Sequence, residues 1–234
     1  MDNEGPLSFQ LRNRWSAADD YEFDCGPHVD VIHVAALWPT DQMLSLETLG
    51  IESLKMEKRD YLCRVPMSTL LRAETKASYS TRSAETQLLS DIKAIREQSS
   101  TEGRQAIIFI AYDLGAIVLK NALALASRSR RKYRDIFHDT AVTIFCGCPQ
   151  RSSNFEIFQK DLFMFLLGRQ TEEWSLLLTF STITRLAQNI DASTSAFINS
   201  KLTMRSRVFS LYARENGPGS IHAVKLIQIS LNLF

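Results

Sequence analysis

The sequence has almost no excess of charge of either sign. Its 234 residues include 27 Lys and Arg against 26 Asp and Glu, a net charge of +1. Such a balance produces no long-range attraction toward phosphate backbones, which argues against a nucleic-acid partner. Hydrophobic residues make up 45% of the chain and charged residues 23%, the proportions of a folded domain with a sizeable core.

Long apolar runs are also missing. No stretch approaches about 18 uncharged apolar residues, so the sequence predicts no transmembrane segment. The segment 1–14 is polar and contains acidic side chains, without the apolar core of a secretory signal. We therefore expect a cytoplasmic protein.

Cysteine is scarce, and its spacing does not fit a metal site. The four cysteines are Cys25, Cys63, Cys146 and Cys148. The last two form a Cys-Gly-Cys pair, but no second pair lies at the spacing of a zinc site. The sequence predicts buried free thiols, no metal and no cofactor.

Linkers rich in proline or glycine, internal repeats and low-complexity tracts are absent, which indicates one domain. We expect residues 1–28 to be loosely ordered or to add an edge strand near 7–11. Residues 29–234 then form a single domain that is incomplete at its C-terminus, since no last helix follows the final apolar strand.

Continuous apolar segments alternate with segments of helical periodicity. The predicted strands cover 29–37, 105–110, 140–146, 206–212 and 223–230, and a less clear strand lies near 69–73. The predicted helices cover 83–103, 114–126, 155–167, 174–189 and 193–201, and a less clear helix lies near 41–49. This alternation predicts a three-layer α/β fold, with a mostly parallel central sheet and helices on both faces.

The most informative stretch is a sharp turn at Asp113. Only three residues separate the apolar strand ending at Ile110 from the apolar helix beginning at Leu114. Small residues flank the turn, Ala111 before it and Gly115 after it. This is the construction of a nucleophile elbow, in which G-x-S-x-G presents a serine above the sheet. Here the pattern reads A-x-D-x-G.

Three blocks in register carry a resemblance to a known family. They are Val29–Pro39, Ile107–Ala126 and Val142–Ser153, with a weaker echo at Phe209–Tyr212. Together they resemble the lipase-like α/β-hydrolase domain of fungal proteins, which is often N-terminal to NACHT, ankyrin or tetratricopeptide regions. That family is similar to the serine esterases and glycolipid deacylases.

The departures from the family fall on the positions that serine chemistry needs. Asp113 replaces the nucleophilic serine, and Ala35 and Ala36 replace the His-Gly of the oxyanion loop. Leu114 follows the nucleophile position, where the family supplies the other oxyanion amide. The late histidine of the family is not found. His222 precedes the last strand and is a weak candidate for it.

Other sequence alternatives stay open. Some α/β-hydrolases use an elbow aspartate to form an alkyl-enzyme ester, but they need a histidine to hydrolyse it. Trp38 could then donate to a leaving group. Ser152 and Ser153, on a loop after a strand, are weak candidates for an alternative nucleophile. Asp113 could also serve only as a cap for the helix that follows.

The sequence therefore favours a non-catalytic α/β-hydrolase-like domain that binds other protein domains, a lipid or a small molecule. The alternative is an active hydrolase that uses Asp113 as nucleophile or retains carboxylester hydrolysis.

Overall fold

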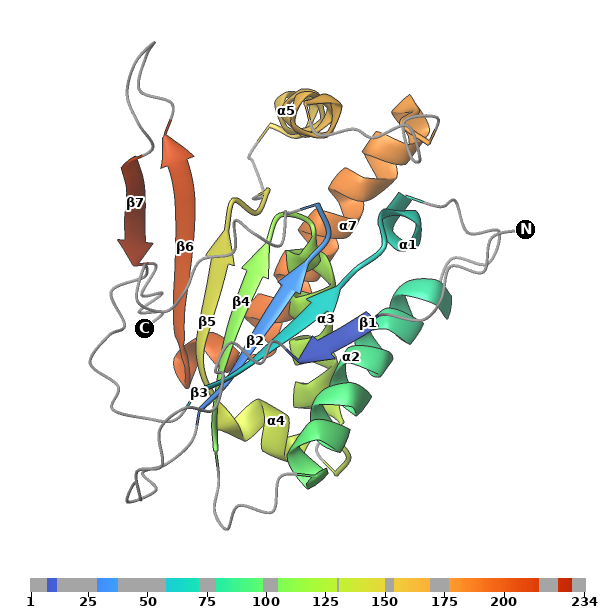
Figure 1. The fold of residues 1–234 in the computed structure, drawn as a ribbon. Coiled ribbons are helices and arrows are strands. Elements are labelled where there is room, and N and C mark those ends of the chain that lie inside the picture. The colour runs from blue at the N-terminus through green and yellow to red at the C-terminus, as the bar shows by residue number, and fades with distance from the viewer. Residues whose placement is uncertain are drawn as a thin grey trace, which may run out of the picture.

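A computed structural model describes residues 8–11, 29–37, 58–71, 79–98, 105–129, 131–149, 154–168, 177–214 and 223–228 (Figure 1). The predicted helix near 41–49, Cys25, Trp38, Ser152, Ser153 and His222 lie outside these ranges.

Seven strands form one sheet in the order β1-β3-β2-β4-β5-β6-β7 (Figure 1). They are β1 (Ser8–Leu11), β2 (Val29–Ala35), β3 (Lys58–Arg64), β4 (Ala106–Tyr112), β5 (Thr140–Cys146), β6 (Arg207–Arg214) and β7 (Ala223–Gln228). The five central strands are parallel, and β1 and β7 pair antiparallel at the two edges. The predicted α/β class with a mostly parallel central sheet is confirmed.

The strands β2 and β4 lie at the centre because their sequences are apolar on both faces. Every residue of β2 is buried, and so is every residue of β4 after Ala106. In register, Ala35 at the end of β2 lies beside Tyr112 at the end of β4. This pairing brings the loop after β2 next to the turn after β4.

The helices of the described part are α1 (Met67–Leu71), α2 (Tyr79–Gln98), α3 (Gly115–Arg128), α4 (Arg134–Asp139), α5 (Phe155–Leu167) and α7 (Phe180–Asn199), followed by the 3-10 helix η2 (Leu202–Met204). Their buried side chains join one core cluster with one face of the sheet. A smaller cluster on the other face consists of strand residues. None of the described helices is long and apolar enough to cross a membrane.

The helix α3 is buried along most of its length between the sheet and α7. Even Lys120 is only 3% exposed. Its Nζ donates to Oγ1 of Thr194 at 3.1 Å and lies 5.0 Å from the ring centroid of Phe145. These contacts give the buried ammonium a partner on α7 and one on β5.

Several predictions from the sequence were wrong in detail. A strand was predicted near 69–73, but residues 69–71 belong to helix α1, and the rest of that range lies outside the described residues. Pro66 precedes the helix, and its carbonyl accepts from the amide of Thr69 at 3.0 Å. Met67, Leu70 and Leu71 are then buried at helical spacing.

Two predicted helices form one continuous helix in the structure, and two further elements were not predicted. The helices expected at 174–189 and 193–201 are the single helix α7, because no breaker lies between them and the hydroxyl of Ser193 bonds the carbonyl of Ile190. The strand β3 was missed because charged residues occupy its first half. The helix α4 was missed because its six residues are too few to show a helical period.

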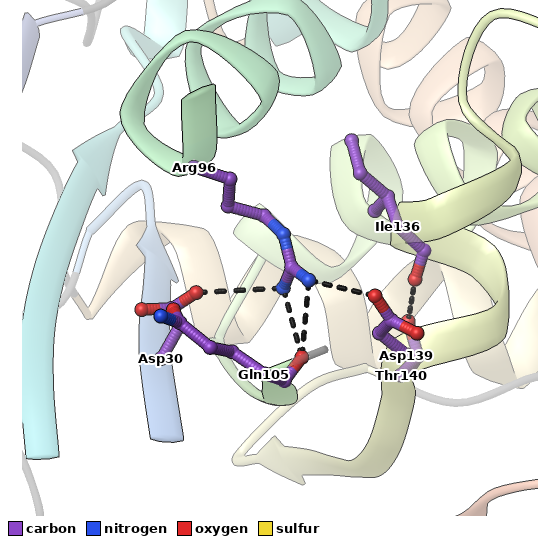
Figure 2. A network of polar contacts seen from close by, with 6 residues as sticks. All are labelled: Asp30, Arg96, Gln105, Ile136, Asp139 and Thr140. Atoms are coloured by element: carbon purple, nitrogen blue, oxygen red, sulfur yellow. Dashed lines mark hydrogen bonds and ion pairs between the residues drawn. The ribbon is translucent and has the colours of Figure 1, made fainter. Parts of the chain in front are cut away.

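A buried network of charged side chains lies at the amino ends of the sheet strands (Figure 2). Arg96 of α2 extends between Asp30 at the start of β2 and Asp139 at the end of α4. Its Nη1 lies 3.4 Å from Asp30 Oδ2, and its Nη2 lies 2.7 Å from Asp139 Oδ2. Both nitrogens also donate to the carbonyl of Gln105, just before β4, at 3.1 Å. One guanidinium therefore joins the helices α2 and α4 to the start of β2 and to the residue before β4.

Replacing Arg96 with Ala should destabilise the fold by about 3–5 kcal/mol, because two buried carboxylates lose their partner. Lys93→Ala on the same helix is the matched control. Its pair with Glu97 is exposed, with side-chain exposures of 45% and 66%, and should contribute less than about 1 kcal/mol. Urea denaturation measures both variants. Equal losses in the two would contradict a structural role for the network.

Candidate functional site

The turn between β4 and α3 holds Asp113 in an unusual backbone conformation. Its φ is 47°, in the left-handed region that residues other than glycine seldom adopt. Aspartate tolerates this region better than most side chains do. The amide of Asp113 donates to the carbonyl of Cys146 at the end of β5, at 3.1 Å. The turn is thus fixed to the neighbouring strand.

Gly115 is required by the close approach of α3 to β2. A Cβ atom at this position would lie 2.5 Å from the carbonyl oxygen of Val34 and 2.9 Å from its carbonyl carbon. Both are backbone atoms within the central sheet, so neither can move aside cheaply. The small residue expected two positions after the turn therefore has a steric reason.

Gly115→Ala should destabilise the protein by about 1–3 kcal/mol or more, because an added methyl overpacks a rigid contact. Gly168→Ala is the control, since a Cβ there would meet its nearest neighbour, the carbonyl of Met164, at an ordinary 3.5 Å. Thermal unfolding of both variants tests the difference. A Gly115 variant as stable as the Gly168 variant would show that β2 and α3 can separate.

The carboxylate of Asp113 is surrounded by backbone amides. The amide of Leu37 donates to Oδ2 at 2.9 Å, and the amide of Ala36 donates to Oδ1 at 3.2 Å. The amide of Gly115 also donates to Oδ1, at 3.2 Å. Two of these donors come from the loop after β2 and one from the first turn of α3. The side chain therefore joins two segments that are 76 residues apart or more in the sequence.

This geometry differs from a simple helix cap. The N-cap position of α3 is Leu114, which makes no side-chain cap hydrogen bond. Asp113 lies one residue earlier and serves the β2 loop as well as the helix. The predicted capping role is therefore right only in part, because the bond to Gly115 is one of three.

Asp113 is completely buried, with 0% of its surface exposed. Burial raises the pKa of its carboxyl above the usual range, and the amides of Gly115, Leu37, Ala36 and Leu114 act in the opposite direction. The site thus presents no free carboxylate to a substrate. Its amide donors already serve an oxygen acceptor of the chain itself.

The raised pKa makes the contribution of Asp113 to stability dependent on pH. Because the folded protein holds this proton more tightly than the unfolded chain, the contribution is fully present below the unfolded pKa of about 3.9. It is lost as pH rises through the folded pKa. The free energy of unfolding of the wild type, minus that of Asp113→Asn, should therefore fall as pH rises. Urea titrations at a series of pH values measure it, and a difference that grows with pH would contradict the raised pKa.

No histidine bonds the Asp113 carboxylate in the described part of the chain. His33 of β2 has other partners. Its Nδ1 lies 3.1 Å from the hydroxyl of Tyr112, and its Nε2 lies 3.7 Å from Asp60 Oδ1. This Asp–His–Tyr array was not predicted from the sequence, where its only signal was a histidine inside an apolar strand. Tyr112 is fully buried, so the array joins three strands within the sheet.

The residues expected to form the oxyanion loop lie in three different environments. The amide of Ala36 reaches Asp113, whereas Ala35 ends β2 and its carbonyl accepts from the amide of Val65 at 2.8 Å. Leu114 is fully buried. The amide of Leu37 was not anticipated. Backbone donors leave no mark in a sequence, so only the position of the loop could have indicated it.

The three cysteines in the described part of the chain are buried, which favours their protonated form. Cys63, Cys146 and Cys148 are free thiols, and burial raises the pKa of Cys63 and of Cys146 to about 12. Burial also raises the pKa of Cys148 well above the usual value. A protonated thiol is a poor nucleophile and a poor metal ligand. In the described ranges, no group of three or more His, Cys, Asp or Glu residues could hold a metal ion.

Comparison with known proteins gives the following results. No protein-family model matches the chain, and no curated protein sequence matches it. Among solved structures, a protein described as a carboxylesterase from Lactobacillus plantarum WCFS1 is 12% identical, with a TM-score of 0.41, over 87% of this chain and 86% of that one. The carboxylesterase Cest-2923 from the same strain is also 12% identical, with a TM-score of 0.40, over 88% and 82%.

A serine hydrolase involved in carbazole degradation is 10% identical, with a TM-score of 0.29, over 80% of this chain and 70% of that one.

The architecture itself is clear. Five parallel strands with a strand–elbow–helix unit at their centre make an α/β-hydrolase-like fold.

Proposed function

We propose that this protein is a non-catalytic α/β-hydrolase-like domain that acts as a binding or signalling module. The observation that carries the proposal is the state of the Asp113 carboxylate, which is fully buried and bonded by the amides of Ala36, Leu37 and Gly115. In ester hydrolysis, amides of this kind must be free to stabilise a developing oxyanion. Here they are already in use.

An ester substrate meets a second obstacle at the same place. A transition-state oxyanion near these amides would lie against a carboxylate, and like charges at short distance repel strongly in a buried site. Protonation of Asp113 would remove the repulsion but would leave its oxygens on the donors. Either state of the carboxyl disfavours acyl transfer.

The alternative is an active hydrolase with Asp113 as covalent nucleophile. That chemistry needs an exposed carboxylate, a pocket for the alkyl group and a histidine to activate water. The carboxylate is buried, and among the described residues its partners are backbone amides. We therefore rank this alternative second.

A binding role has separate support at the carboxyl ends of the strands. The helix α5 lies beyond these ends (Figure 1), and its N-cap residue Asn154 accepts a hydrogen bond from the amide of Ile157 through its side-chain oxygen. Its outer surface exposes large apolar side chains: Phe155 (41%), Ile157 (55%) and Met164 (56%). Apolar groups gathered on one helix in this way are typical of an interaction surface.

The buried free thiols of the described core fit a reducing compartment, so we place the protein in the cytoplasm. From the resemblance of its three sequence blocks, we also propose that it is related to the lipase-like domains of fungal receptor proteins. A protein domain, a lipid or a small apolar molecule would then be its partner.

Turnover assays test the proposal directly. Wild type, Asp113→Ala and Asp113→Ser should be assayed with short acyl esters, a haloalkane panel and an epoxide panel. We expect no turnover above the uncatalysed rate in any of them, because among the described residues no histidine bonds the side chain of Asp113 to serve as a base. Wild-type turnover that disappears in Asp113→Ala would overturn the non-catalytic role and favour the covalent alternative.

A further inference from the structure

The helix α5 presents apolar side chains on its outer surface as well as on its inner one. Phe158, Leu162 and Leu166 are buried against the core, each about one turn after the last. On the other side of the helix, Ile157 and Met164 are 55% and 56% exposed. They are about two helical turns apart, so both lie on one line along the helix. Large apolar side chains that face outward in a row are typical of a surface that another molecule covers.

Two opposite charges lie between these apolar side chains. Lys160 and Asp161 come three and four residues after Ile157, which places them on the same face of the helix. We define the outer stripe as the four residues Ile157, Lys160, Asp161 and Met164, all of which are exposed. Within the described part of the chain, neither charged residue forms a salt bridge. Along the helix the outer stripe is therefore apolar, positive, negative and apolar, with its charges available to another molecule.

This order is complementary to itself when two helices run antiparallel. The midpoint between Lys160 and Asp161 is also the midpoint between Ile157 and Met164. A second copy of α5, related by a twofold axis level with that midpoint, places its Met164 opposite Ile157 of the first. Its Asp161 then lies opposite Lys160. Because both copies use the same surface in a twofold dimer, each contact occurs twice, which gives two apolar contacts and two ion pairs.

Further exposed apolar side chains lie along one side of the outer stripe. Phe163 and Leu167 are 38% and 39% exposed, one helical turn apart. Gln159, one turn before Phe163, donates to Oγ1 of Thr184 on α7 at 2.7 Å. One turn before Thr184, at the start of α7, Phe180 is 81% exposed. A twofold axis keeps this side of one copy next to the same side of the other, so these apolar groups would gather beside the paired stripes.

We propose that α5 is the site at which this protein pairs with a second copy of itself, with the two outer stripes antiparallel. The inference rests on the proposed binding role and names its partner. A lipid surface fits less well, because Asp161 lies in the middle of the stripe and its short side chain cannot carry the carboxylate back to water as a long lysine can.

The size of the helix limits the strength of this dimer. A helix of 13 residues is about 20 Å long, and it makes a contact smaller than the roughly 800 Å² per partner of stable complexes. The dissociation constant should therefore be on the order of 10 µM. Sedimentation equilibrium of the full chain over a series of concentrations measures it.

Charge reversal tests the antiparallel register. Lys160→Asp makes both charges of the stripe negative, and Asp161→Lys makes both positive. Each variant alone should dimerise about tenfold more weakly than the wild type, because both ion pairs become contacts between like charges. An equimolar mixture of the two should form a heterodimer with the affinity of the wild type, because each charge then faces its opposite. Recovery in the mixture depends on pairing between stripes and does not follow from a change in stability.

Met164→Asp should weaken the dimer by about a hundredfold, because it places a carboxylate opposite Ile157 twice. Met204→Asp is the matched control, since Met204 is 69% exposed in η2, beyond the other end of α7, and should leave the dimer unchanged. Circular dichroism checks that the variants fold. The wild-type concentration series and the mixture decide the case if one of them does not.

Three results would overturn the inference. They are a wild type that is monomeric up to concentrations on the order of 1 mM, a mixture that dimerises no better than its two components, and equal losses in the two methionine variants. A monomeric wild type that binds phosphatidylcholine vesicles, and loses that binding in Met164→Asp, would assign the stripe to a lipid surface instead.

These outcomes are separate from the catalytic test, since they are read without an ester. Turnover by the wild type would overturn the non-catalytic role whatever its oligomeric state. A monomeric wild type without turnover would overturn only the pairing with a second copy.

Discussion

The contact between the Asp113 carboxylate and the amides of Ala36 and Leu37 is the interaction on which the carboxyl end of the sheet depends. It joins the loop after one central strand to the turn after the next. Without an acceptor there, the half-buried amides of the loop would lose their partner, at a cost of up to about 1–3 kcal/mol for each. The Asp113 side chain thus stabilises the architecture around the turn.

The sequence predicted the parts of the fold that depend on hydrophobic pattern. The strand Thr140–Cys146 and the helix Phe155–Leu167 have the predicted bounds, because continuous and helical apolar periods are unambiguous there. The strand Lys58–Arg64 was not predicted, because its charged residues interrupt the apolar pattern. Near residue 70 the sequence suggested a strand, but Pro66 and its hydrogen bond from the amide of Thr69 favour a helix.

The site was predictable to a smaller extent. The position of the turn followed from the short distance between an apolar strand and an apolar helix, and its small neighbours followed from close packing. The partners of Asp113 did not, because they are backbone amides brought near by the register of β2 beside β4. A residue type carries no information on which amides face it. A sequence can therefore indicate an elbow aspartate without indicating that it is fully enclosed.

The network around Arg96 has a consequence for the history of such a domain. It binds Asp30 at one end of β2, whereas the amide of Ala36 reaches Asp113 just beyond the other end. A strand of seven residues spans roughly 20 Å, so the two sets of contacts are nearly independent. Mutations at the elbow then leave the distant anchor intact. A domain built in this way can change the residues at its elbow in the course of evolution while its chain still folds.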